Sequence, residues 1–125
     1  MRLQRAHHVS FAVRDLARAR RFYEDVLGLA EIPRPALGIP GAWYGVGGSE
    51  VHLIETPAGV EVGAPPPALS PLANHAAFAI EDYDAAVAHL RARGVEVLES
   101  GRGVAQLWVR DPDGNVIELI VPPGG

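Results

Sequence analysis

The feature that most constrains the fold of this 125-residue sequence is an internal repeat. The segment HHVSFAVRDL at 7–16 aligns with NHAAFAIEDY at 74–83, and VHLIETP at 51–57 aligns with IELIVPP at 117–123. Self-similarity at a nearly constant offset predicts two copies of one structural unit, and two copies are too few for a solenoid. We therefore expect a pseudo-symmetric pair of modules.

Each copy predicts the same order of elements. In the first copy the apolar run 9–13 is typical of a strand, and Asp15 is a suitable N-cap for a helix that ends near Gly28. In the second copy Asp82 and Gly94 take the same places. Three predicted strands follow each helix, so each module reads β-α-β-β-β. The other predicted strands are 31–32, 43–46 and 50–55 in the first copy, and 76–80, 96–98, 106–110 and 116–121 in the second.

The length suits one ordinary domain, so we expect a single domain over residues 1–125. Module one is predicted at about 5–56 and module two at about 74–122. The segment between them, about 57–73, is rich in proline and has little periodicity, which indicates a linker.

Composition excludes several classes of protein. The sequence has no cysteine, so disulfides, thiolate nucleophiles and cysteine-based zinc sites are ruled out. It also has no lysine, which rules out a Schiff-base lysine and a P-loop. The net charge of −4 argues against a nucleic-acid partner and against a polybasic membrane patch. With no long apolar run, we expect a soluble cytoplasmic protein.

Two pairs of metal-binding residue types occupy equivalent places in the two copies. His8 and His52 belong to the first and last predicted strands of module one, and His75 and Glu118 belong to those of module two. Because side chains alternate between the two faces of a strand, each of the four points away from the apolar residues that pack on the helix. The pattern predicts that all four side chains enter one space.

Imidazole and carboxylate groups together suit a divalent first-row metal ion such as Zn, Ni, Fe or Mn. Without His52, two histidines and one glutamate have the composition of the facial triad of non-haem iron enzymes. For each histidine the alternative is a hydrogen-bonded place in the core. His7 has the opposite strand parity and is expected to face outward, and His89 is expected on a solvated helix face. The segment DPDGN at 111–115 predicts a hairpin turn rather than a calcium site.

Four segments carry a family resemblance: HHVSFAVRDLARARRFYEDVLGL, GAWYGVGGSEVHLIE, NHAAFAIEDYDAA and DPDGNVIELI. With them the sequence resembles the vicinal oxygen chelate (VOC) superfamily, which includes glyoxalase I, bleomycin-resistance proteins, extradiol dioxygenases, methylmalonyl-CoA epimerase and fosfomycin-resistance proteins. The resemblance implies an α+β fold in which two βαβββ modules form a cupped mixed sheet, and commonly a homodimer. It also implies that His8, His75 and Glu118 match the metal positions. His52 falls where glyoxalase I has a glutamate and the epimerase a glutamine.

The resemblance and the ligand set together favour a metal-dependent enzyme that acts on a small oxygenated molecule. We expect a glyoxalase-like lyase or isomerase that stabilises an enolate-type intermediate, with Glu118 as ligand and base. One alternative is an extradiol-type dioxygenase that uses Fe(II). Another is a non-catalytic protein that binds a small molecule, as in bleomycin resistance. Candidate substrate-binding residues are Trp43, Gln106, Trp108 and Arg110, with Tyr44 as a further residue that could line the pocket.

Overall fold

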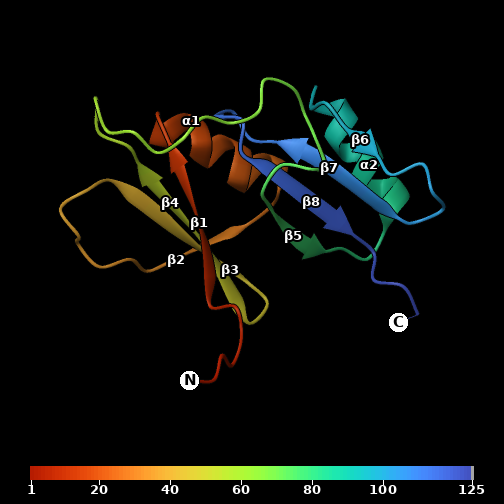
Figure 1. Cartoon of the computed structure of the whole chain (residues 1–125), viewed down its shortest axis with the longest axis horizontal. Helices are drawn as coiled ribbons and strands as arrows, with labels where there is room; N and C mark the ends of the chain where they lie inside the picture. The colour runs from red at the N-terminus through yellow and green to blue at the C-terminus, as the bar shows by residue number, and fades with distance from the viewer. Residues whose placement is uncertain (125) are drawn as a thin grey trace. The chain divides into compact units, whose positions relative to one another are not determined.

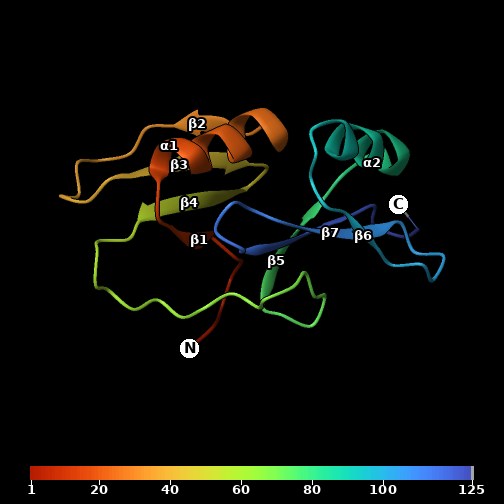
Figure 2. The ribbon, with the colours of Figure 1, turned by 90° about the horizontal axis from the view of Figure 1, so that it is seen from above.

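The computed structural model describes residues 1–124, and the chain divides into two compact units, Met1–Gly63 and Ala64–Gly125. Each unit contains one four-stranded mixed sheet and one helical segment, in the order β-α-β-β-β (Figure 1). The predicted α+β class and the repeat of two βαβββ modules are therefore confirmed. Within each unit, the helical segment lies along one face of that unit's own sheet (Figure 2).

In the first unit the strand order is β1-β4-β3-β2. The last strand of the module returns beside the first, because β4 pairs with β1 in parallel and with β3 in antiparallel orientation. This places the two predicted ligand strands next to each other. The elements are β1 His8–Val13, α1 Leu16–Arg20, a π-helical continuation η1 Arg21–Val26, β2 Ala30–Ile32, β3 Gly41–Val46 and β4 Ser49–Glu55.

The second unit has the same topology, with the strand order β5-β8-β7-β6 and a parallel pair formed by β5 and β8. The predicted strand at 96–98 is displaced, because the structure forms β6 at Leu98–Glu99 instead. Its short ladder is set by the pairing of Leu98 with Trp108 on β7. The elements are β5 His75–Ala79, α2 Tyr83–Ala92, β6, β7 Gln106–Arg110 and β8 Val116–Ile120.

The predicted helix starts are confirmed by side-chain caps. The Asp15 carboxylate accepts a hydrogen bond from the backbone N–H of Arg18, and that of Asp82 accepts one from Ala85, at 3.1 and 3.0 Å. Each cap satisfies an amide that has no partner inside the helix. The first helix differs from the prediction, since its second half is π-helical and the Leu27 N–H bonds to the Phe22 carbonyl.

The predicted turn at 111–115 is also confirmed. Asp111 is buried, and its carboxylate accepts hydrogen bonds from the backbone N–H groups of Asp113 and Asn115 at 2.9 Å. The Asn115 side chain donates to the same carboxylate at 2.8 Å. The acidic side chain therefore closes the β7–β8 connection through backbone amides.

The core of each unit lies between the sheet and its helical segment. Tyr44, which the sequence offered as a pocket-lining residue, belongs to this core instead: it is fully buried, and its O–H donates to the Glu24 carboxylate at 2.7 Å. Burial and this bond raise the pKa of the Tyr44 phenol. Fully buried core residues include Val13, Tyr23, Val51 and Leu53 in the first unit, and Leu90, Leu107, Val109 and Ile117 in the second.

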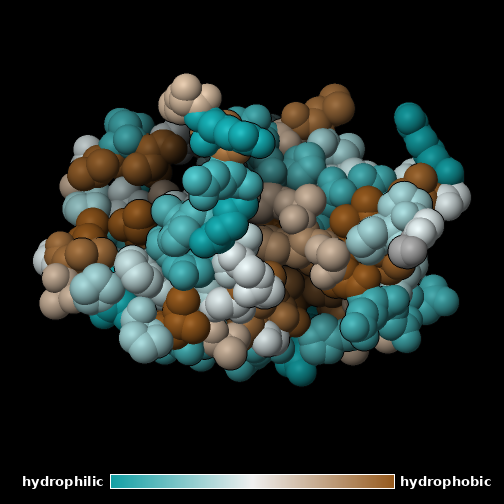
Figure 3. Space-filling view, turned by 90° about the horizontal axis from the view of Figure 1, so that it is seen from below, coloured by the Kyte–Doolittle hydropathy of each residue, from teal (hydrophilic) through white to brown (hydrophobic). Residues whose placement is uncertain are grey.

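On the face of the molecule in Figure 3, hydrophobic and hydrophilic atoms are interspersed. The exposed large apolar residues are scattered along the chain and include Leu37, Val60 and Leu72. Among residues 1–124, no helix has the length and apolar character needed to cross a membrane.

Candidate functional site

In the second unit, strands β5 and β8 bring a predicted pair of ligands together. His75 lies on β5 and Glu118 on β8, and the parallel register places Ala77 beside Glu118. As strand alternation requires, both side chains lie on the sheet face opposite Ile117 and Leu119, and Nε2 of His75 lies 3.0 Å from Oε1 of Glu118. The His75 side chain is 23% exposed and that of Glu118 is 10% exposed. The pair is thus largely buried, with His75 the more exposed member.

Each side chain of this pair makes a further hydrogen bond through its other polar atom. Nδ1 of His75 lies 2.7 Å from the carbonyl oxygen of Ala73, and the side-chain amide of Gln106 donates to Oε2 of Glu118 at 2.9 Å. A carbonyl can only accept, so Nδ1 carries the proton and Nε2 is the nitrogen that faces the carboxylate. The contact with Oε1 therefore needs a further proton or a cation.

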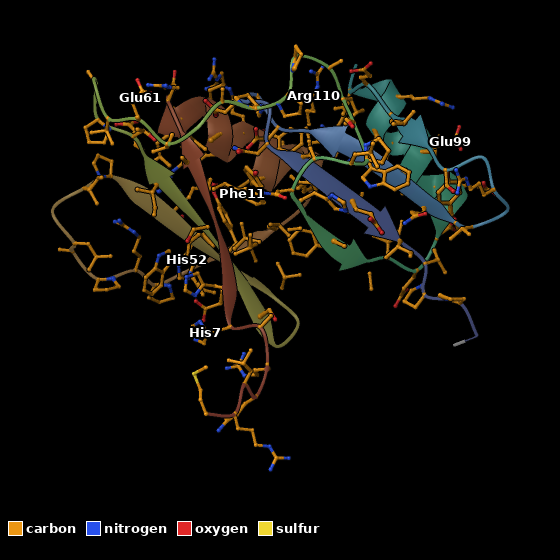
Figure 4. All side chains as sticks on the ribbon, viewed as in Figure 1. His7, Phe11, His52, Glu61, Glu99 and Arg110 are labelled. Atoms are coloured by element: carbon orange, nitrogen blue, oxygen red, sulfur yellow. The ribbon has the colours of Figure 1, made fainter. Side chains whose placement is uncertain are left out.

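The neighbouring strand β7 contributes two other predicted residues to this unit. Trp108 pairs directly opposite Glu118 and is buried, and its indole N–H has no hydrogen-bond partner among residues 1–124. Arg110 lies at the far end of β7 (Figure 4), where its guanidinium pairs with Glu96 at 2.9 Å. A second N–H of Arg110 reaches the carbonyl of Pro67 at 3.5 Å.

In the first unit, strands β1 and β4 bring the equivalent pair together. His52 lies opposite Ser10 on β1, and its ring stacks on that of His8 with a centroid distance of 4.0 Å. On its other side the His52 ring stacks on Trp43 of β3, with centroids 4.2 Å apart and planes 8° apart. His52 is 7% exposed, so the two flanking rings fix its orientation.

A carboxylate that the sequence analysis did not single out also binds His52. Glu50 lies two residues earlier on β4, and its Oε1 lies 2.8 Å from Nε2 of His52. This hydrogen bond lowers the pKa of Glu50. The available signal was positional, because residues two apart on a strand share a face. Desolvation of the ring, followed by the imidazoles of His52 and His7, lowers the pKa of His8.

Two histidines were expected outside the site. His89 is exposed on α2, as predicted. His7 is also exposed, yet its Nδ1 lies 3.0 Å from Nδ1 of His8 (Figure 4 shows His7 at the start of β1). It therefore faces solvent and contacts the neighbouring imidazole at the same time.

The structure thus holds two pairs of donors, one in each unit. Among residues 1–124, no three histidine, aspartate or glutamate side chains are arranged to hold a metal ion. The chemistry of the His75–Glu118 pair nevertheless fits a divalent metal, because one imidazole nitrogen and one carboxylate oxygen face each other. The other ring nitrogen of His75 donates to the Ala73 carbonyl, and the other carboxylate oxygen of Glu118 accepts from the Gln106 amide. Metal-ligating histidines and carboxylates are commonly oriented in this way.

Comparison with known proteins places the chain in a family. Residues 5–119 match the model of the Glyoxalase/Bleomycin resistance protein/Dioxygenase superfamily. The sequence is 33% identical to Glyoxylase I 4 of Arabidopsis thaliana, over 95% of this chain and 71% of that protein. It is 27% identical to mitochondrial methylmalonyl-CoA epimerase of Bos taurus, over 94% of this chain and 74% of that protein.

The fold is similar to that of solved structures as well. A glyoxalase/dioxygenase from Nostoc punctiforme superimposes with a TM-score of 0.77 at 26% identity, covering 96% of this chain and 92% of that one. The chain therefore belongs to the Glyoxalase/Bleomycin resistance protein/Dioxygenase superfamily, also known as the vicinal oxygen chelate superfamily.

Proposed function

We propose that the protein is a metal-dependent enzyme that acts on a small oxygenated molecule, as a glyoxalase-like lyase or isomerase. The observation that supports this most directly is the His75–Glu118 pair, in which Nε2 and Oε1 lie 3.0 Å apart. Hydrogen bonds to the Ala73 carbonyl and the Gln106 amide orient the two side chains. Members of the superfamily typically bind divalent metals and act on small molecules. Relatives named as a glyoxylase and an epimerase support the lyase or isomerase class.

His75 and Glu118, together with His8 and His52, would hold the metal ion, and Zn, Ni, Fe or Mn suits this donor set. When bound, such an ion acts as a Lewis acid on oxygen atoms of the substrate. The lowered pKa of His8 favours the neutral imidazole, which is the form that binds metals.

Glu118 is the proposed base. Its carboxylate is buried to 10% side-chain exposure, and Gln106 fixes Oε2, so Oε1 is the atom that would take a proton from carbon next to a substrate carbonyl. His52 stands where glyoxalase I has a second carboxylate. Nε2 of His52 binds Glu50, and the ring stacks between His8 and Trp43. The chain therefore has an oriented imidazole where glyoxalase I has the carboxylate.

The substrate would contact the residues beside these pairs. Trp43 and Trp108 offer aromatic surface, and Gln106 adds an amide next to Glu118. Arg110 stays a weaker proposal for binding a carboxylate, because Glu96 already pairs with its guanidinium. We also propose a homodimer, since members of the superfamily are often dimers; light scattering on purified protein measures this directly.

Metal analysis and activity assays test the proposal together. We expect the purified 125-residue protein, loaded in turn with Zn, Ni, Fe(II) and Mn, to bind near one equivalent of metal. With Ni or Zn, it should exchange the carbon-bound proton of the hemithioacetal of methylglyoxal and glutathione. Glu118→Gln should abolish the exchange, and His89→Ala, on the exposed face of α2, should leave it unchanged.

The alternatives give different outcomes in the same assays. The donor set of His8, His75 and Glu118 also has the composition of a non-haem iron site. Oxygen consumption with a catechol and Fe(II), without proton exchange, would therefore show a dioxygenase. A protein that binds no metal but retains a small molecule would be a binding protein, and the proposed enzyme activity would be wrong.

A further inference from the structure

We propose that the indole N–H of Trp108 donates a hydrogen bond to an oxygen atom of the small molecule bound at the His75–Glu118 pair. The inference rests on the proposed function and makes Trp108 a residue that positions the ligand through one of its oxygen atoms.

The argument begins with an unpaired donor. Trp108 is 8% exposed, and its Nε1 is buried without a hydrogen-bond partner in the described part of the chain. Buried N–H groups are rarely left unpaired in native proteins, since an unmade bond costs the full desolvation of the group. The indole can only donate, so what satisfies it must be an acceptor.

The register of the sheet places the Trp108 side chain on the same face as the proposed site. Trp108 and Glu118 are directly opposite each other in the β7–β8 ladder, so their side chains share one face. Gln106 lies two residues before Trp108 on the same face and reaches Glu118 at 2.9 Å, which shows how close this part of β7 is to the carboxylate.

The other donors on this face already have partners. The Gln106 amide donates to Oε2 of Glu118, and the Arg110 guanidinium pairs with Glu96. The Trp108 N–H is different because Glu118, the nearest carboxylate along the register, is engaged by His75 and Gln106. The indole N–H is thus a buried donor, on the sheet face that carries the pair, without an acceptor in the described part of the chain.

Donation from a buried N–H selects the ligand by its chemistry. A negatively charged oxygen accepts a stronger hydrogen bond than a neutral one, and a ligand without an acceptor at that point would leave the N–H unpaired. The ligand must therefore present an oxygen acceptor to the indole as well as an atom that approaches His75 and Glu118.

The test uses the zinc-loaded, ¹⁵N-labelled 125-residue protein with acetohydroxamate, a small molecule with two adjacent oxygens, as the probe. The sequence has two tryptophans, so the spectrum contains two indole N–H signals, and Trp108→Phe identifies one of them by its loss. We expect acetohydroxamate to move the Trp108 indole proton signal downfield. We also expect Trp108→Phe to weaken acetohydroxamate binding about tenfold while zinc affinity is unchanged.

Tyr83→Phe is the matched control, since it also removes one donor from an aromatic ring, here the O–H that binds Glu99 on the α2 side of the unit (Figure 4 shows Glu99 beside α2). It should leave acetohydroxamate binding unchanged. If Trp108→Phe does not fold, Trp43→Phe assigns the two indole signals instead, and the shift of the wild-type Trp108 signal decides the matter.

Two outcomes would overturn the inference, and only the first of them is compatible with the proposed function. If zinc and acetohydroxamate bind while the Trp108 signal stays in place and Trp108→Phe binds equally well, the indole has another partner, such as a water molecule, and the proposed function survives. If the wild-type protein binds no zinc, the proposed function and the role of Trp108 fail together.

Discussion

Nε2 of His75 lies 3.0 Å from Oε1 of Glu118, across the parallel pair β5 and β8. The same diagonal relationship joins His8 and His52 across β1 and β4, where the two rings stack at 4.0 Å. Both pairs arise from one topology, in which the last strand of each module returns beside the first. Duplication has therefore produced two pairs of donors with different chemistry, one imidazole–carboxylate and one imidazole–imidazole.

The contribution of His52 to metal binding is tested by His52→Ala. If His52 is a ligand, zinc affinity measured by calorimetry should fall at least tenfold, because one donor is removed from the set. His8→Ala and His75→Ala should lower it further. His89→Ala provides the control for loss of a histidine elsewhere. Unchanged zinc affinity in His52→Ala would leave His8, His75 and Glu118 as the ligand set.

Gln106 should act through Glu118. Gln106→Ala removes the amide that holds Oε2 at 2.9 Å, so the carboxylate loses its fixed orientation. We expect zinc affinity to fall by about tenfold or more, the usual effect of removing a group that orients a metal ligand. The matched control is Gln4→Ala, the same change at an exposed position. Equal zinc affinities of the two variants would show that the Gln106 contact is unimportant.

Tyr44→Phe should destabilise the protein by about 1 kcal/mol at pH 8, because it removes the buried hydrogen bond to Glu24. The effect should also depend on pH. Folding raises the pKa of Tyr44, so its contribution is fully present below the unfolded tyrosine pKa of about 10 and is lost as the pH rises above it.

Urea unfolding at pH 8 and at pH 10.5 measures both parts of the Tyr44 prediction. The difference in unfolding free energy between wild type and Tyr44→Phe should be smaller at the higher pH. Tyr83 is present in both proteins, so its own raised pKa of about 12 cancels in the comparison. A difference that grows between the two pH values would contradict the assigned direction.

The cap of α2 can be tested by replacing Asp82. Asp82→Ala should lower the free energy of unfolding by about 1 kcal/mol, because the Ala85 N–H loses its acceptor at 3.0 Å. Asp82→Asn keeps an oxygen at the same place and should recover most of that loss. Thermal or urea unfolding gives the comparison, and equal losses in the two variants would mean that the charge matters and the cap does not.

Several features followed from the sequence because they depend on local physics. The repeat predicted two βαβββ modules, and Asp15 and Asp82 were recognisable as caps from their place before an apolar periodic run. The alternation of side chains on a strand correctly put His75 and Glu118 on one sheet face. The caps and the strand alternation need only a few consecutive residues each, and the repeat needs only a comparison of the sequence with itself.

Other features depend on the pairing of distant segments. The stack of Trp43 on His52 requires the β3–β4 register, and the unpaired N–H of Trp108 depends on everything that packs around it. Tyr44 was misplaced because alternation alone does not tell which face of an inner strand the helix covers.

The sequence by itself determined the two modules, most of their elements and the sheet faces of His75 and Glu118, since strand alternation and helix capping act over short stretches of chain. Tertiary structure alone decided which oxygen and nitrogen atoms face each other. His75 faces Glu118, and Gln106 binds Glu118, because strand register and side-chain rotamers place these groups within 3.0 and 2.9 Å. Contacts of that kind depend on the whole packed unit, so no local pattern in the sequence specifies them.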